Sequence, residues 1–256
     1  NGWGEKTSIM GILNITPDSF SDGGDFFSIE NALLQTQKLV QSGVDILDIG
    51  AQSTRPGADI IGEKEEIKRL LPTLIEIRKN FPNLIISIDT FNAEVAYEAL
   101  KNGANWINDV TGGKNDKSIL DVVAEFDCPY VITHSKGNSK TMNKLSVYNN
   151  LMEEIINSLI ELSESAIYKN VRKDKIIWDP GLGFAKNKDH NIFILKNLDR
   201  LKSFDFPLLI GASRKRFIGE ILNENNPKKR DIGSLAVSCL CAQKHIDIVR
   251  VHDVKL

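Results

Sequence analysis

A carboxylate ends one of the most apolar short runs of the chain. The run 176–178 leads directly into Asp179, and the chain then turns through 180–184, which contains a proline and two glycines. Packing does not require an acid at the end of a buried strand. A carboxylate on a rigid strand end above a glycine-containing loop presents a hydrogen-bond acceptor to a ligand. We therefore interpret Asp179 as a ligand-facing acceptor.

The same arrangement recurs along the chain. Polar residues follow further apolar runs: Asp48 after 46–47, Asp89 after 85–88, Asn108 and Asp109 after 106–107, and Ser213, Arg214 and Lys215 after 208–210. Such residues would gather at the carboxyl ends of successive strands, where α/β barrels place their active sites.

Apolar runs alternate with amphipathic segments throughout. We predict strands over 8–13, 44–49, 84–88, 106–110, 130–133, 176–178, 208–211 and 246–251. Helices are predicted over 31–41, 64–79, 93–101, 118–125, from Leu151 to Ala166, over 191–201, and in pieces ending near Lys244. The repeat is roughly 30 residues, the size of a βαβ unit. This pattern predicts a (β/α)8 TIM barrel forming one domain over residues 1–256.

An open doubly wound sheet is the alternative fold. It usually carries a glycine fingerprint after its first strand, whereas Leu13 is followed by Asn-Ile-Thr-Pro-Asp over 14–18. We therefore favour the barrel. The polar linkers 15–27, 52–62 and 135–147 are long for a compact domain, so we expect functional loops at one end of the barrel.

The composition fits an enzyme that acts on small molecules. A net charge of -2 gives no bias toward nucleic acid or anionic membranes, so we expect neither as a partner. No apolar run approaches the about 20 residues of a spanning helix, and the polar start does not resemble a signal peptide. We expect Cys128, Cys239 and Cys241 to be buried thiols in the cytoplasm.

Several motifs together resemble those of the dihydropteroate synthase family, a group of pterin-binding TIM-barrel enzymes. Residues 14–24 resemble its first loop, and Ser53-Thr54-Arg55-Pro56-Gly57 resembles its second. The remaining signatures follow in the family's order: 87–90, 108–110, 179–184, 213–215 and 250–254. Each motif alone is weak, but the set covers nearly the whole chain.

The resemblance implies synthesis of 7,8-dihydropteroate from dihydropterin pyrophosphate and p-aminobenzoate, with release of pyrophosphate. It assigns the pterin to Asp89, Asn108, Asp179 and Lys215. A pterin edge carries N–H donors beside carbonyl and ring-nitrogen acceptors, which carboxylates, an amide and a cation can bind. Helix capping explains either aspartate alone but not the whole set.

The leaving pyrophosphate requires positive charge. Arg250 and His252 lie two residues apart on the last strand and would project to the same side. Asn14 resembles the family residue that contacts Mg²⁺ or the pyrophosphate, and an amide oxygen suits a magnesium ion that keeps most of its waters.

The resemblance places p-aminobenzoate among residues of two loops and two strand ends. These are Thr54, Arg55, Pro56, Phe184 and Ser213, with Phe20 closing over them. A turn alone would also explain 54–57. No covalent nucleophile is recognisable, so we expect displacement through a cation-like pterin methylene. Two departures from the family are Ser135, where it usually has Met, and Gln52, where it often has Glu.

Two alternatives share the barrel. A pterin-binding methyltransferase domain of the corrinoid-dependent kind would need neither the first-loop motif nor Arg250 and His252. A pterin-binding protein without activity would not need the intact set of charged residues.

We also expect a helix after the eighth strand or a partner subunit to cover strands eight and one, because the sequence reaches Leu256 where that helix would begin. The family's last helices resemble a dimer interface, so the expected assembly is a homodimer.

Overall fold

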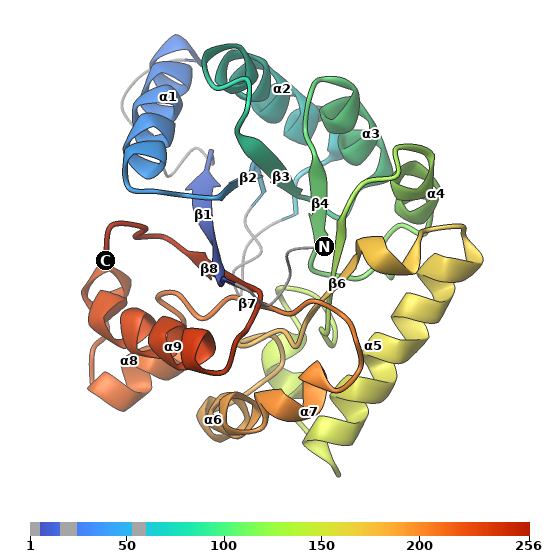
Figure 1. Ribbon diagram of the computed structural model, residues 1–256, viewed down its shortest axis with the longest axis vertical. Coiled ribbons are helices and arrows are strands. Elements are labelled where there is room, and N and C mark those ends of the chain that lie inside the picture. The colour runs from blue at the N-terminus through green and yellow to red at the C-terminus, as the bar shows by residue number, and fades with distance from the viewer. Residues whose placement is uncertain (1–5, 16–24, 53–59) are drawn as a thin grey trace.

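The computed structural model describes residues 6–15, 25–52 and 60–256. Its strands form one parallel sheet in the order β6-β5-β4-β3-β2-β1-β8-β7. The strands are β1 Ser8–Asn14, β2 Ile46–Gly50, β3 Ile85–Asp89, β4 Trp106–Asp109, β5 Tyr130–Thr133, β6 Ile176–Asp179, β7 Leu209–Ile210 and β8 Ile248–Val251. Figure 1 shows the strands at the centre of the molecule with helices around them.

The sheet curls until its two edge strands meet. β6 and the residue just before β7 are joined by one parallel bridge, between Trp178 and Leu208. The Trp178 amide also donates to the Pro207 carbonyl at 2.8 Å. β7 is only two residues long, so the closure is short and the barrel is nearly rather than fully closed. The expected TIM barrel is confirmed, and the open doubly wound sheet is excluded.

Helices cover the outside of the barrel. They are α1 Asp25–Gln41, α2 Glu63–Asn80, α3 Ala93–Lys101, α4 Ser118–Glu125, α5 Leu151–Tyr168, α6 Lys188–Lys196, α7 Leu198–Lys202, α8 Arg216–Leu222 and α9 Asp231–Gln243. In the described part of the chain, the 3-10 turns η2 Met142–Leu145, η3 Lys173–Lys175 and η4 Pro227–Arg230 lie between them. In Figure 1 α1 to α5 run round the top and right, and α6 to α9 the bottom and lower left.

One segment that was predicted as a single helix contains parts of two helices. The segment 191–201 contains the end of α6 and the start of α7, separated at Asn197. The Asn197 side chain donates to the Phe193 carbonyl at 2.7 Å. An asparagine that bonds its own backbone competes with the helix ladder, which explains a break that hydrophobic periodicity did not reveal.

Apolar side chains fill the lower interior of the barrel. The buried cluster there consists of Met10, Ile46, Trp106, Val131, Ile177, Leu209 and Ile248. Two residues further along five of these strands stand Asp48, Asn108, Thr133, Asp179 and Arg250. Because residues two apart on a strand share a face, the apolar cluster forms a floor beneath a polar layer.

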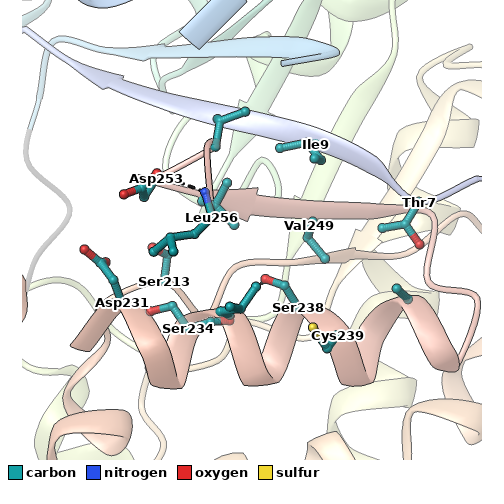
Figure 2. Close-up of a pocket in the computed structure, with 14 residues that line it drawn as sticks. Thr7, Ile9, Ser213, Asp231, Ser234, Ser238, Cys239, Val249, Asp253 and Leu256 are labelled. Atoms are coloured by element: carbon teal, nitrogen blue, oxygen red, sulfur yellow. Dashed lines mark hydrogen bonds between the residues drawn. The ribbon is translucent and has the colours of Figure 1, made fainter. Parts of the chain in front are cut away.

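A groove lies on the outer wall of the barrel, between α9 and the outer faces of β1 and β8. Its lining includes Ile9, Val249, Val251, Val254 and Leu256, and Figure 2 shows Ile9, Val249 and Leu256 around it. Within the described residues no helix follows β8. The Asp253 carboxylate instead accepts from the Lys255 and Leu256 amides at 3.0 and 3.3 Å. The expectation of a covering helix or subunit stays a prediction.

The cysteines are free thiols, and two of them, Cys128 and Cys241, are buried. The expectation of burial is wrong for Cys239, which is exposed. Residues two apart on a helix face different sides, so Cys239 cannot share the buried face of α9 with Cys241. No helix in the described part of the chain is long and apolar enough to cross a membrane.

Candidate active site

The described site residues all lie at the carboxyl end of the barrel. Asn14, Asp89 and Asp179 end their strands, Asn108 and Arg250 lie within theirs, and Ser213, Lys215, Phe184 and His252 follow β7, β6 and β8. Phe20, Thr54, Arg55 and Pro56 lie outside the described residues. The described site residues therefore lie together at the end of the barrel where the sequence predicted them.

Arg250 joins two buried carboxylates. Its Nη2 donates to Asp89 Oδ2 at 2.8 Å, and its Nε donates to Asp48 Oδ2 at 2.6 Å. Asp48 is fully buried and Asp89 is 7% exposed. The guanidinium thus lies beside a carboxylate of the expected pterin site, and its expected role with His252 toward pyrophosphate stays a prediction.

Several buried polar atoms of this layer face the interior without a partner. Among the described residues, Asp48 Oδ1, Asp89 Oδ1, Ser87 Oγ and Thr133 Oγ1 are buried and accept or donate no hydrogen bond. Buried polar groups are normally paired, so each unpaired atom requires an explanation. A ligand with several N–H donors would supply partners for the carboxylate oxygens.

Two glycines lie close to the two strand-end aspartates. A Cβ at Gly50 would lie 3.5 Å from Asp89 Cβ and 3.7 Å from Asn14 Oδ1. The Gly181 amide donates to Asp179 Oδ1 at 2.7 Å. Gly181 has φ +68°, and a Cβ there would lie 2.0 Å from the His134 carbonyl oxygen. Only glycine fits this close turn, which fixes the Asp179 carboxylate.

Burial dominates the electrostatics. It raises the pKa of Asp89 to about 7, with Arg250 opposing the shift and Asp48 adding to it. Burial also raises the pKa of Asp179, against the nearby Lys215. The pKa of Lys215 is lowered to about 8 by burial, with Asp179 opposing. A buried cation beside two buried carboxylates with raised pKa values is typical of a functional site.

Lys215 links the loop after β7 to the loop after β6. Its Nζ donates to the Leu182 carbonyl and stands 4.7 Å from the centroid of the Phe184 ring. This brings together two residues predicted for different substrates, so the two predicted pockets share a wall.

Ser213 and His252 form a second pair. The His252 amide donates to Ser213 Oγ at 3.1 Å, and Oγ lies 2.9 Å from His252 Nδ1. Since Oγ already accepts the amide proton, its own proton can be donated to Nδ1. That arrangement favours the tautomer with the ring proton on Nε2, which suits an imidazole that donates to an anion.

Sequence reasoning missed three buried residues. Asp48 was recognised as a strand-end acid but given no role, although it bonds both Arg250 and Asn108. Lys186 and His134 are buried and lie 2.8 Å apart between Nζ and Nδ1. The strand-end position was a signal for Asp48, whereas nothing in the sequence distinguishes Lys186 from a surface lysine.

The two departures from the family pattern have structural partners. Gln52 is buried, and its Oε1 accepts from the Ile61 amide at 3.1 Å. The Ser135 carbonyl accepts from Lys114 Nζ at 3.3 Å. Neither residue bonds the Asp48–Arg250–Asp89 group.

Among the described residues, the one protein ligand expected for a magnesium ion is the side-chain oxygen of Asn14. No group of three or more His, Cys, Asp or Glu side chains capable of holding a metal occurs in the described residues. Asn14 lies at the rim of the barrel and is partly buried. Mg²⁺ keeps several waters and takes phosphate oxygens, so an amide oxygen here is compatible with it.

Known proteins match the chain along its length. The family model described as pterin binding enzyme matches residues 10–252. A dihydropteroate synthase of Synechocystis is 46% identical over 253 residues, covering 99% of this chain and 87% of that protein. The Yersinia pestis enzyme, solved with a sulfonamide drug complex, superposes with a TM-score of 0.92 at 38% identity, covering 98% of this chain and 90% of that one. The Xanthomonas albilineans enzyme in complex with 7,8-dihydropteroate gives 0.87 at 34% identity, with the same coverage, 98% and 90%.

Proposed function

Because the chain belongs to the pterin-binding enzyme family, as a dihydropteroate synthase, we propose that each of its strand-end residues has a separate role in the dihydropteroate synthase reaction. The reaction joins 6-hydroxymethyl-7,8-dihydropterin pyrophosphate to p-aminobenzoate, giving 7,8-dihydropteroate and pyrophosphate in folate biosynthesis. The relatives are named for this activity, so the corrinoid-dependent methyltransferase is not retained.

The pterin binds on the apolar floor against Asp89, Asn108, Asp179 and Lys215. The observation that carries this assignment is the unpaired, buried Oδ1 of Asp89, which stands with three other unpaired buried oxygens of the described residues. The aspartates accept from the pterin N–H and amino groups, and Lys215 donates to the ring carbonyl or N5. Asn108 both donates and accepts.

Arg250 and His252 stabilise the leaving pyrophosphate. The Arg250 side chain is 19% exposed, so part of the guanidinium faces the mouth of the barrel. Asn14 would hold Mg²⁺, which when bound supplies positive charge to the pyrophosphate oxygens.

Displacement is dissociative. The bond between the pterin methylene and the pyrophosphate oxygen breaks first, and pyrophosphate carries away the electron pair. Asp89 and Asp179 favour the resulting cation electrostatically. The arylamine nitrogen of p-aminobenzoate then bonds to the methylene carbon and loses a proton. Phe184 and Ser213 bind this second substrate together with Thr54, Arg55, Pro56 and Phe20, and closed loops exclude water from the cation.

The proposed assembly is a homodimer. Three large apolar side chains of the last helices, Ile221, Leu222 and Ile232, are exposed. α8 and α9 pack so closely that a Cβ at Gly233 would lie 2.5 Å from Ile218 Cγ2. Exposed apolar side chains on two packed helices are typical of a subunit interface. We place the protein in the cytoplasm, since its three cysteines are free thiols.

One assay tests the function. Pyrophosphate release should require both the pterin pyrophosphate and p-aminobenzoate, with 7,8-dihydropteroate formed in equal amount. Release without p-aminobenzoate would indicate a hydrolase. Pterin binding without any release would indicate a binding protein.

A further inference from the structure

Asp48 is a fully buried member of the polar layer. It lies in the middle of β2, at 0% exposure, in register with Ile12 on β1 and Ser87 on β3. Its Oδ2 accepts two hydrogen bonds, from Arg250 Nε at 2.6 Å and from Asn108 Nδ2 at 3.1 Å. One carboxylate oxygen therefore holds both Asn108, assigned to the pterin ring, and Arg250, assigned to the pyrophosphate of the same substrate.

The bond to Asn108 fixes which way its amide points. An asparagine side chain carries a donor end and an acceptor end, which exchange places when the amide rotates by half a turn. With Nδ2 turned to Asp48, the Asn108 carbonyl oxygen and the second amide proton keep fixed positions. Asn108 is only 3% exposed, so no water competes for that orientation as it would at the surface.

Asp48 also holds Arg250 by the inner end of its guanidinium. The bond to Nε leaves the outer nitrogens, Nη1 and Nη2, directed away from Asp48, and Nη2 donates to Asp89. Burial works to lower the pKa of Arg250, but Asp48 and Asp89 outweigh it and the pKa is raised. Because Asp48 holds its Nε, the Arg250 guanidinium would keep its position when the Asp89 carboxylate bonds a ligand instead.

We propose that Asp48 is a positioning residue that sets the orientation of Asn108 and Arg250 for the pterin substrate without contacting p-aminobenzoate. The inference rests on the proposed assignment of Asn108 and Arg250 to that substrate. Asp48 and Arg250 are 202 residues apart in sequence, so the barrel itself brings the pair together.

The first test is Asp48→Asn, which keeps the shape but removes the negative charge, so the bonds to Arg250 and Asn108 lose their charge assistance. Calorimetry with the pterin pyrophosphate should show a dissociation constant raised about tenfold or more, as expected for loss of a charge-assisted hydrogen bond. The KM for p-aminobenzoate should change less than about threefold. Weakened stability with unchanged pterin affinity would overturn the proposal.

Asp109→Asn is the matched control. Asp109 is also a fully buried aspartate at a strand end, but its carboxylate accepts from Tyr130 Oη and the Gly113 amide at 2.7 Å each. It should melt at a lower temperature with pterin affinity unchanged. An equal loss of pterin affinity in both variants would mean that general loosening explains the effect, which also counts against the proposal.

A double-mutant cycle separates positioning from direct contact. In an Asn108→Ala background, Asp48→Asn should cost less pterin affinity than in the wild type, because one residue that Asp48 positions is gone. If the two losses simply multiply, Asp48 acts independently of Asn108 and the proposal is wrong. Wild-type protein that fails to release pyrophosphate would instead count against the proposed function.

Discussion

Lys186 Nζ lies 2.8 Å from His134 Nδ1, and both side chains are buried. Burial, with the nearby Lys186 adding to it, lowers the pKa of His134 to about 2, so the ring is neutral and Nδ1 can accept. Lys186 also donates to the Phe184 carbonyl at 3.0 Å. This lysine therefore ties the end of β5 to the loop that carries Phe184.

Replacing Lys186 with methionine should loosen that loop. Phe184 loses the donor to its carbonyl, so we expect a raised KM for p-aminobenzoate and a destabilisation of about 1–3 kcal/mol. Steady-state kinetics and thermal melts measure the two effects. Lys188→Met, at an exposed lysine on the first turn of α6, is the control and should change neither. A lower melting temperature with normal kinetics would limit Lys186 to a structural role.

The pH dependence of catalysis should be narrow. Asp89 must be ionised to accept from the pterin and has a pKa of about 7, so kcat/KM should fall below that value. Lys215 must be protonated to donate and has a pKa of about 8, so kcat/KM should fall above it.

Lys215→Arg should test the assignment of the basic limb. Arginine stays charged, so the decline at high pH should move out of range while residual activity remains. Lys215→Ala should abolish turnover, yet melt within a few degrees of the wild type. A basic limb that persists in the arginine variant would place it on another group.

Asp89 should weaken the fold as the pH rises. Its pKa is about 7 in the folded protein against a usual value of 3.8, so the folded state binds more protons between these values. By linkage, the stability that Asp89 contributes is fully present below pH about 4 and lost as the pH rises through about 7.

Asp89→Asn removes that dependence. The free energy of unfolding of the variant minus that of the wild type should increase as the pH rises from about 4 to about 8. Pterin binding by the variant should be lost. Denaturant melts at several pH values measure it. A difference in stability that stays constant with pH would mean that Asp89 does not titrate in this range.

The substrates should bind in order. The pterin pyrophosphate should bind the free enzyme, and p-aminobenzoate only weakly until pyrophosphate and the first two loops complete its pocket. Calorimetric titration of each substrate, alone and after the other, decides the matter. Tight p-aminobenzoate binding to the free protein, with the loops still cleaved by protease, contradicts this order.

Local pattern was enough for much of the fold. The bounds of α3, α4 and β5 agree with those predicted, because periodicity and flanking residues specify such elements from within. β2 begins at Ile46 rather than at Val44, since the Asp45 carboxylate accepts from the Ile9 amide at 2.8 Å instead. That partner lies on another strand and is invisible to a local pattern.

The sequence likewise predicted part of the candidate site but not all of it. Residue type and strand-end position predicted Asp89, Asn108, Asp179 and Lys215 at one end of the barrel, where the structure has them. Position did not predict that Arg250 pairs with Asp48 and Asp89, because the pairing depends on how side chains from β2, β3 and β8 share the interior. Such partnerships are decided by packing rather than by sequence neighbours.

The short closure between β6 and β7 has a consequence for how the barrel opens. Asp179 stands on one side of this seam and Lys215 on the other, and a single backbone bridge joins the strands between them. The backbone amides there should be among the first in the sheet to exchange with solvent. A pterin bound by both residues would connect the two sides of this seam. Pterin binding would then stabilise the closed barrel, and opening of the seam would weaken pterin binding.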